Sequence, residues 1–363
     1  MKVIIIPDSF KGTLSASTVA QTLGQAVMAA CPGCEIKLLP VADGGEGTLE
    51  CFRSFMGGET VEKEVTGPNF QQVNARLLLC GETAVVETAQ AAGLPLANPK
   101  DAKSTTTYGV GELICEAKKL GAKRIILGIG GSATNDCGCG AAAATGVRFF
   151  NAQGESFVPV GKTLSLVEKI DFTEKTDITV LCDVKNPLYG RDGAAYVFAP
   201  QKGADEADVA LLDDGMRRFS QVLSRYGKDV AEVQGAGAAG GMGAGMLAFF
   251  GATLKSGIDT VLEMSDFKGA VCDADVVITG EGCLDSQSFS GKVIDGVVSA
   301  SCGKPVIAVV GISRLENPRE FSLHKVFETN EAHLDFEIIK GRALEDLKLC
   351  AEKVAQYLHE HFY

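Results

Sequence analysis

Four glycine-rich loops, three of which carry carboxylates, constrain the fold of this chain most; each lies after or near a strand-like apolar run. They cover residues 42–47, 128–136, 235–245 and 280–286. Glycine permits positive φ and close backbone approach, so such loops can turn several N–H groups toward one anion. Nearby Asp and Glu side chains suit a divalent cation. The loops therefore indicate an α/β protein that handles phosphoryl groups.

Strand-like and helix-like stretches alternate along most of the chain. Strands are expected at residues 3–6, 35–40, 124–127, 178–182, 195–198, 274–279 and 305–310. Helices are expected at residues 15–30, with Ser15 as N-cap, and at 48–55, 107–120, 205–226, from about 292, and near the C-terminus. Between residues 59 and 88 the apolar period changes to two without a helix, which predicts antiparallel strands.

This pattern predicts a Rossmann-like parallel-sheet domain with an inserted second, mixed α/β domain. The first is expected to be discontinuous, from residues 1–65 and 270–363, and the second to cover residues 66–269. Ligands of open parallel sheets bind outside the carboxyl ends of the strands. The active site is therefore expected in the cleft between the two domains.

Charge and cysteine content limit the partners and the compartment. The chain has 34 Lys+Arg against 46 Asp+Glu, a formal charge of -12, and no basic block, so nucleic acid and anionic membrane are poor partners. No signal sequence or membrane span is evident, and we expect a soluble, cytoplasmic protein. The twelve cysteines have no framework spacing and should be reduced; the pairs Cys31/Cys34 and Cys137/Cys139 are expected to pack rather than react.

The glycine loops could bind either the phosphates of a mononucleotide or the pyrophosphate of a dinucleotide. A Walker A loop is absent, because Ser156 stands where Gly161-Lys162-Thr163 would need an earlier glycine. The segments beginning at Gly128 and Gly235 fit the dinucleotide fingerprint weakly, since neither is followed by a clean strand that ends in an acidic residue. An NAD-dependent oxidoreductase of a small hydroxy acid is therefore one alternative.

Histidine chemistry is disfavoured, because all four histidines lie within the last 40 residues, outside the glycine loops. The chemistry must then come from carboxylates, cations and a metal. The candidate carboxylates are Asp43, Glu46, Asp136, Asp183, Glu281 and Asp285, and the candidate cations are Lys11, Arg191, Lys202 and Lys292.

Six segments, in order between residues 3 and about 311, resemble the type I glycerate kinase family. They are residues 7–16 (PDSFKGTLSA), 42–48 (ADGGEGT), 128–136 (GIGGSATND), 182–188 (CDVKNPL) with 200–204 (PQKGA), the loop 235–245, and 278–282 (ITGEG). The resemblance implies a cytoplasmic enzyme that uses ATP and Mg²⁺ to phosphorylate D-glycerate to 2-phosphoglycerate. Two departures stand out: Cys283 replaces an expected arginine, and Cys137 and Cys139 occupy positions of small residues.

Roles follow from motif position and from the needs of phosphoryl transfer, which are mainly positioning and charge neutralisation. Catalysis is assigned to Lys11, Asp43 and Glu46, with Asp43 as the base. Nucleotide binding is assigned to Gly130, Gly131, Ser132, Asn135, Gly237, Gly240, Gly241 and Lys292. Substrate binding is assigned to Ser9, Lys11, Arg191 and Lys202, and magnesium to Asp136, Glu281 and Asp285. A non-catalytic sugar-acid sensor is a second alternative, and the oligomeric state stays open.

Overall fold

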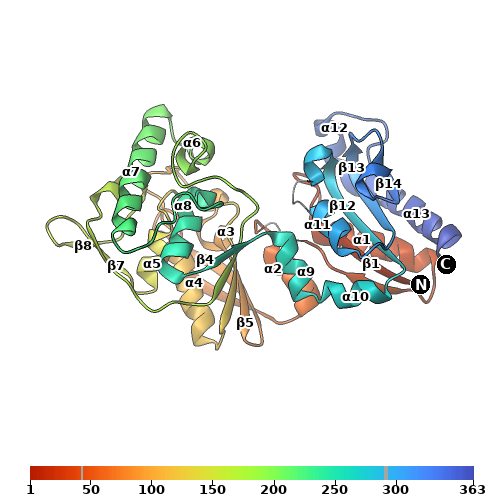
Figure 1. The fold of residues 1–363 in the computed structure, drawn as a ribbon, viewed down its shortest axis with the longest axis horizontal. Helices are drawn as coiled ribbons and strands as arrows, with labels where there is room; N and C mark the ends of the chain where they lie inside the picture. Colours follow the sequence, from red (N-terminus) through yellow and green to blue (C-terminus); the bar gives the residue numbers. More distant parts are fainter. Residues whose placement is uncertain (42–43, 290–292) are drawn as a thin grey trace. The chain divides into compact units, whose positions relative to one another are not determined.

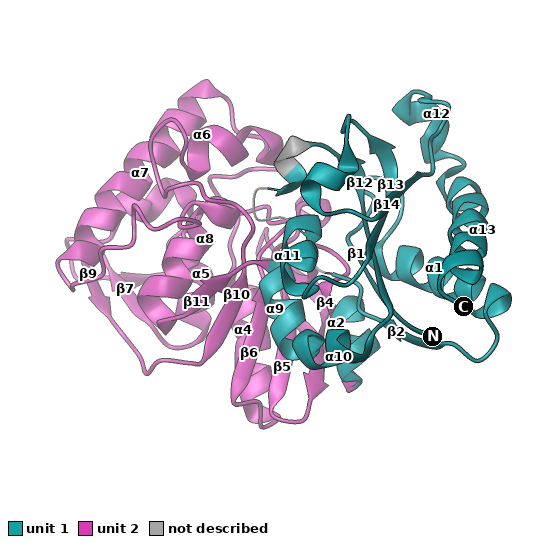
Figure 2. Ribbon diagram, turned by 45° about the vertical axis from the view of Figure 1, so that its right-hand side comes forward, with its two compact units in different colours: residues 1–42, 50–57, 257–363 teal, residues 43–49, 58–256 magenta. Residues whose placement is uncertain are grey.

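The structure, a computed structural model, describes residues 1–41, 44–289 and 293–363. The chain forms two compact units (Figures 1 and 2). Unit 1 comprises residues 1–42, 50–57 and 257–363, and unit 2 comprises residues 43–49 and 58–256. Each unit is built around its own sheet, which confirms the predicted α/β class. No helix within the described ranges is both long enough and apolar enough to cross a membrane.

The sheet of unit 1 has five strands in the order β14-β13-β12-β1-β2, and all neighbours are parallel. The strands are β1 (Lys2–Pro7), β2 (Glu35–Leu38), β12 (Val276–Leu284), β13 (Val306–Ser313) and β14 (Lys325–Glu328). The helices are α1 (Ala16–Ala30), α2 (Thr48–Met56), α9 (Gly257–Met264), α10 (Phe267–Asp273), α11 (Val293–Ala300), α12 (Phe336–Lys340) and α13 (Ala343–His361), with 3₁₀ turns η5 (Ser286–Phe289) and η6 (Pro318–Phe321). Strand β2 is two residues shorter than predicted.

Layering in unit 1 explains its apolar strands. Five consecutive residues of β1, from Val3 to Pro7, are buried, as expected for a parallel strand that is covered on both faces. Helices α1 and α13 cover one face and α9 to α11 lie on the other (Figure 2). Helix α1 begins at the predicted cap, because the Ser15 hydroxyl accepts a hydrogen bond from Thr18 N at 3.1 Å. Leu347, Val354 and Leu358 of α13 pack on the same core.

Unit 2 has a six-stranded sheet in the order β11-β10-β6-β5-β4-β3 and a three-stranded antiparallel sheet, β8-β7-β9. Strands β5, β6, β10 and β11 are parallel, and β3 and β4 form the antiparallel edge. The strands are β3 (Glu59–Thr66), β4 (Gln72–Cys80), β5 (Thr83–Glu87), β6 (Arg124–Gly128), β7 (Arg148–Phe150), β8 (Ser156–Phe157), β9 (Lys169–Asp171), β10 (Ile178–Leu181) and β11 (Thr253–Lys255).

The helices of unit 2 are α3 (Thr88–Ala92), α4 (Tyr108–Lys119), α5 (Cys139–Ala144), α6 (Ala194–Phe198), α7 (Glu206–Ser224) and α8 (Ala238–Gly245). Shorter turns are η1 (Leu94–Leu96), η2 (Gly161–Leu166), η3 (Pro200–Lys202) and the π-helical η4 (Met246–Phe250). Residues 195–198, predicted as a strand, belong to helix α6. A four-residue apolar run does not specify its own period, and here Ala195 is buried while Tyr196 and Val197 are exposed.

The unit boundaries also differ from the predicted ones. Strand β3 pairs with β4 and so belongs to the sheet of unit 2, whereas the predicted boundary placed it in the first domain. Helices α9 and α10 belong to unit 1, although residues 257–269 were assigned to the insertion. In the sequence, the segment 43–49 stands between two stretches of unit 1. It belongs to unit 2, because its contacts are with β5 and β6.

Candidate active site

The sheet of unit 1 contains a topological switch point between β1 and β12. From β1 the chain proceeds through α1 to β2 on one side, and from β12 it proceeds through α11 to β13 on the other side. The connections therefore leave these two adjacent strands in opposite directions. In open parallel sheets, the crevice beyond the carboxyl ends of such strands is the usual ligand site.

The loop after β1 and the carboxyl end of β12 are in backbone contact at this switch point. Asp8 N donates a 2.8 Å hydrogen bond to Gly280 O, and Asp8 Oδ1 accepts a 2.6 Å bond from Ser9 N. A methyl group at Gly282 would lie 3.5 Å from Lys11 N, so the Lys11 backbone packs directly beside β12. Ser9 and Lys11 thus lie beside β12, which carries Glu281 and leads directly into Asp285.

The side chains of this group differ in their exposure to solvent. Lys11 is exposed, Asp285 is half-buried, and Glu281 retains only 8% of its exposure. Cys283, which replaces the expected arginine, is a half-buried free thiol on β12 opposite Ile312. Two predicted residues, Asp43 and Lys292, lie outside the described residues.

The carboxyl edge of the unit 2 sheet forms a second group. Gly130 N donates to Gly44 O at 2.8 Å, and a methyl group at Gly128 would lie 2.5 Å from the same oxygen. This close approach requires glycine and holds the loop that carries Glu46 against the loop after β6. Glu46 and Gly131 are exposed there, and Gly130 is half-buried.

A buried carboxylate that sequence reasoning missed supports this second group. Glu87, at the end of β5, is 1% exposed, and its Oε1 accepts a 2.6 Å hydrogen bond from Leu49 N in the first turn of α2. The bond ties segment 43–49 to the sheet of unit 2. The available signal was a charged residue directly after the apolar run of residues 84–86. A carboxylate at the end of a buried strand is rarely buried unless it is hydrogen-bonded, so this position indicates a structural hydrogen bond.

Several predicted ligand contacts prove to be internal. Asp136 is fully buried and accepts hydrogen bonds from Thr107 N and Oγ1, both at 2.8 Å, and from the N–H groups of Gly138 and Gly140. Burial raises the pKa of Asp136, although these hydrogen bonds lower it. A carboxylate with four such donors has no open position toward a metal, so its assignment to magnesium is corrected to a structural one.

The glycines of the loop 235–245 are also packing positions. A methyl group would lie 2.1 Å from Pro187 O at Gly237, 1.9 Å from Thr134 O at Gly240, and 2.6 Å from Cys137 Sγ at Gly241. All three glycines are buried. Protein atoms thus fill the place where a side chain would begin, so these buried glycines are required for packing, and their assignment to nucleotide binding is corrected to a packing role.

Four further predicted residues have distinct settings. Asn135 and Lys202 are buried against each other, with Lys202 Nζ 3.4 Å from Asn135 Oδ1, so neither faces a ligand directly. Arg191 is exposed on the turn before α6. Ser132 is 6% exposed, and its hydroxyl bonds the Thr134 hydroxyl at 2.9 Å.

The cysteines differ in burial. None of the twelve, all of which lie within the described ranges, forms a disulfide. Cys137 and Cys139 are buried, and burial raises the pKa of both thiols well above the ordinary value, as expected for packing residues rather than nucleophiles. Within the described ranges, no three His, Cys, Asp or Glu side chains converge on a metal position.

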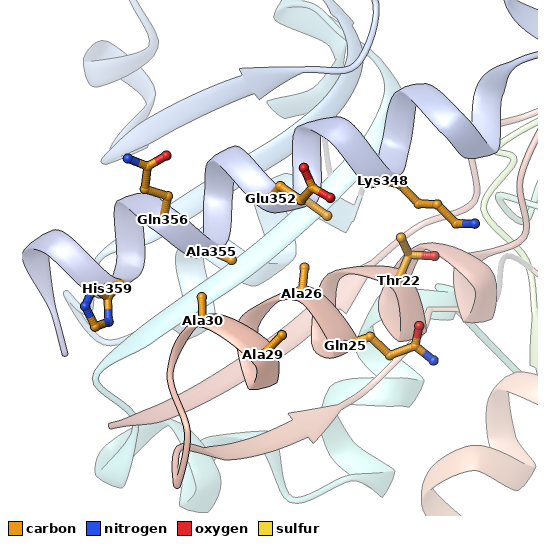
Figure 3. Close-up of a pocket in the computed structure, with 11 residues that line it drawn as sticks. Thr22, Gln25, Ala26, Ala29, Ala30, Lys348, Glu352, Ala355, Gln356 and His359 are labelled. Carbon is orange, nitrogen blue, oxygen red and sulfur yellow. The ribbon is translucent and has the colours of Figure 1, made fainter.

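A groove of about 640 Å³ between α1 and α13 does not belong to either group (Figure 3). Small side chains, among them Ala26, Ala30 and Ala355, face one another across it. It is lined by residues 22–30 of α1, the half of that helix that leads to the amino end of β2. The groove therefore lies away from the carboxyl ends of the strands.

A parallel sheet with a switch point between two adjacent strands and helices on both faces defines an α/β protein of the doubly wound class. The family model described as the glycerate kinase family matches residues 3–359. The glycerate 2-kinase of Escherichia coli K12 is 44% identical over 86% of this chain and 85% of its own length, and the glycerate kinase of Bacillus subtilis 168 is 44% identical over 87% of both.

A crystal structure provisionally described as glycerate kinase 2 from Salmonella typhimurium LT2 superposes with a TM-score of 0.86. It is 40% identical and covers 99% of this chain and 98% of its own. The chain belongs to the glycerate kinase family, and it is a kinase. This sets aside the oxidoreductase and the non-catalytic sensor. In the structure, turns rather than a strand precede Gly235, so the second dinucleotide-like segment lacks its required context.

Proposed function

We propose that this kinase transfers the γ-phosphoryl group of ATP to D-glycerate and forms 2-phosphoglycerate. One observation supports the proposal most directly: in a chain of the glycerate kinase family, the backbone of Lys11 packs against β12, which carries Glu281 and leads directly into Asp285. A cation beside carboxylates suits a reaction between an anionic acceptor and a triphosphate, whose loose transition state needs mainly positioning and charge neutralisation.

The acceptor hydroxyl requires a group that orients it and takes its proton. We assign this role to Asp43. Glu46, three residues later on the same loop, supports it. Lys11 neutralises the glycerate carboxylate or the γ-phosphoryl group, and Ser9 donates a hydrogen bond to the acceptor. Arg191, which is exposed on the turn before α6, is a second residue that would bind the glycerate carboxylate.

The phosphates of ATP are assigned to the loop after β6, where Gly130 is half-buried and Gly131 is exposed, together with Lys292. Magnesium binds few protein carboxylates and takes its other ligands from water and phosphate, so a pair of carboxylates is a sufficient protein site. Glu281 and Asp285 fit this need and would hold the ion. The ion would neutralise charge on the phosphates when bound.

The purified protein is expected to release ADP with D-glycerate and Mg²⁺, and not in the absence of the metal. A coupled ADP assay across small hydroxy acids measures this directly, and phosphorus NMR of the product distinguishes the 2-phosphate from the 3-phosphate. Turnover without metal, or no turnover with millimolar glycerate, would contradict the proposal. Formation of the 3-phosphate would contradict only the product position.

Cys283 provides a test of how the phosphate charge is balanced. A thiol cannot replace the bidentate donor fork of arginine, so another cation should compensate, and Lys292 is the nearest such residue in the following sequence. We expect Lys292→Ala to lower kcat/KM by about 10²-fold, the scale of one lost preorganised charge. We expect Cys283→Arg to change it only modestly. A large gain from Cys283→Arg, with Lys292→Ala close to wild type under saturating ATP, would show a weakened site instead.

A further inference from the structure

Lys202 is the most unusual charged residue of unit 2, because its side chain is almost completely removed from solvent. It is 2% exposed and ends the 3₁₀ turn η3. Lysine is among the residues least often fully buried, and a buried ammonium needs partners that offset its lost hydration. The partners of Lys202 therefore indicate what the residue does.

Those partners belong to the loop that follows β6. Lys202 Nζ donates a 2.6 Å hydrogen bond to Thr134 O and lies 3.4 Å from Asn135 Oδ1. The neighbouring Asp136 is the charged side chain that acts on the ammonium. The loop is thus anchored from inside, three residues after Gly131, its exposed end.

The loop 235–245 also contacts the loop that follows β6. Cys137 N donates to Gly240 O at 3.2 Å, and the Ser132 hydroxyl lies 3.5 Å from Ala239 O. The backbone at Gly240 packs against Thr134 O, the atom that Lys202 also binds. Thr134 O therefore joins η3 and both glycine loops.

We propose that Lys202 is a positioning residue, whose buried ammonium holds Thr134 and Asn135 and so fixes the Gly130–Ser132 backbone that receives the phosphoryl groups of the nucleotide. The inference rests on the proposed function of that loop. It replaces the predicted direct contact between Lys202 and substrate with an action through the backbone.

The charge of Lys202 gives this role a distinctive pH dependence. Burial lowers the pKa of Lys202 to about 7 from its ordinary value of 10.5, and Asp136 opposes the shift. Between these two values the unfolded chain binds more protons at this site than the folded chain, so the contribution of Lys202 to stability rises with pH. An opening of the loop that returns Lys202 to solvent also takes up a proton in this range, so opening becomes less favourable as pH rises. The hold on Thr134 and Asn135 should therefore tighten as pH rises above 7.

The test compares wild type with Lys202→Met, which keeps the length of the side chain and removes the ammonium. The matched control is Lys103→Met, which removes a half-exposed lysine paired with Asp208 at 2.8 Å in the same unit. We expect Lys202→Met to lower kcat at least about tenfold, the scale of a small misplacement of reacting groups, with little change in KM for D-glycerate. Lys103→Met should retain the wild-type kcat.

Amide hydrogen exchange provides a readout that does not depend on turnover. In wild type, peptides covering residues 128–136 should exchange more slowly as pH rises above 7, relative to β3 peptides and after correction for intrinsic rates. This measurement applies even if Lys202→Met fails to fold. A pH-independent ratio would overturn the proposal, as would wild-type kinetics in Lys202→Met. Absence of glycerate kinase activity in wild type would instead refute the proposed function, and the exchange result would still decide the anchoring role.

Discussion

Gly240→Ala is expected to destabilise unit 2 by about 3 kcal/mol or more, a large part of the roughly 5–15 kcal/mol that holds a typical protein folded. Gly240 has φ +72°, where alanine loses roughly 1–2 kcal/mol. The added methyl would also lie 1.9 Å from Thr134 O, a backbone atom that Lys202 fixes. Overpacking against atoms that cannot move aside costs about 1–3 kcal/mol or more. Urea denaturation followed by circular dichroism measures the loss.

Two other glycines separate backbone strain from steric clash. Gly227 has φ +69° and no atom within 4 Å of an added methyl, so Gly227→Ala should cost only the strain, about 1–2 kcal/mol. Gly237 has an ordinary φ of −76°, and its methyl would lie 2.1 Å from Pro187 O, so Gly237→Ala isolates the clash. If Gly240→Ala cost no more than Gly227→Ala, the close approach at Thr134 would be wrong.

Lys11→Ala and Asp43→Asn should each lower kcat/KM for D-glycerate by about 10²-fold or more while leaving the fold intact. This is the typical cost of losing one preorganised charge or one general base. Lys11 is exposed at the switch point, so its removal creates no buried cavity. Steady-state kinetics with thermal unfolding of the same samples measures both effects.

The controls use residues of similar chemistry. Lys348→Ala removes another exposed lysine of unit 1, on α13, and should leave activity unchanged. Glu46→Gln, on the same loop as Asp43, tests whether the effect belongs to one carboxylate or to the loop as a whole. Near-normal kinetics in both Lys11→Ala and Asp43→Asn would remove these residues from the chemistry. A change confined to KM for glycerate would make their role one of uniform binding.

Local patterns predicted those elements whose structure depends on nearby residues. The apolar runs of β1, β6 and β12 and the cap at Ser15 are set by burial on both sheet faces and by one short-range hydrogen bond. The boundaries between the two units were harder to predict from the sequence. The alternating pattern identifies β3 as a strand but does not say that its partner is β4 in the second sheet.

The candidate site was predictable as motifs but not as contacts. Ser9 and Lys11 follow the first strand, so their place at a carboxyl edge could be inferred. The roles of Gly240 and Asp136 could not, because glycine is equally suited to approach a phosphate or another backbone, and a carboxylate in a loop does not reveal its burial. Their partners, Thr134 O and Thr107, come from other parts of the fold.

The position of β1 between β2 and β12 has a consequence for biosynthesis. Its neighbour β12 begins at Val276, and Asp8 N bonds Gly280 O, a residue 272 positions later in the chain. At a translation rate of about 5–20 residues per second, the ribosome needs roughly 15–50 s to make that distance. Meanwhile the apolar strand β1 can pair only with β2, whereas every strand of unit 2 is already complete at residue 255. The nascent chain therefore emerges with its first strand half-paired, and the sheet that carries Lys11 is the last to be completed.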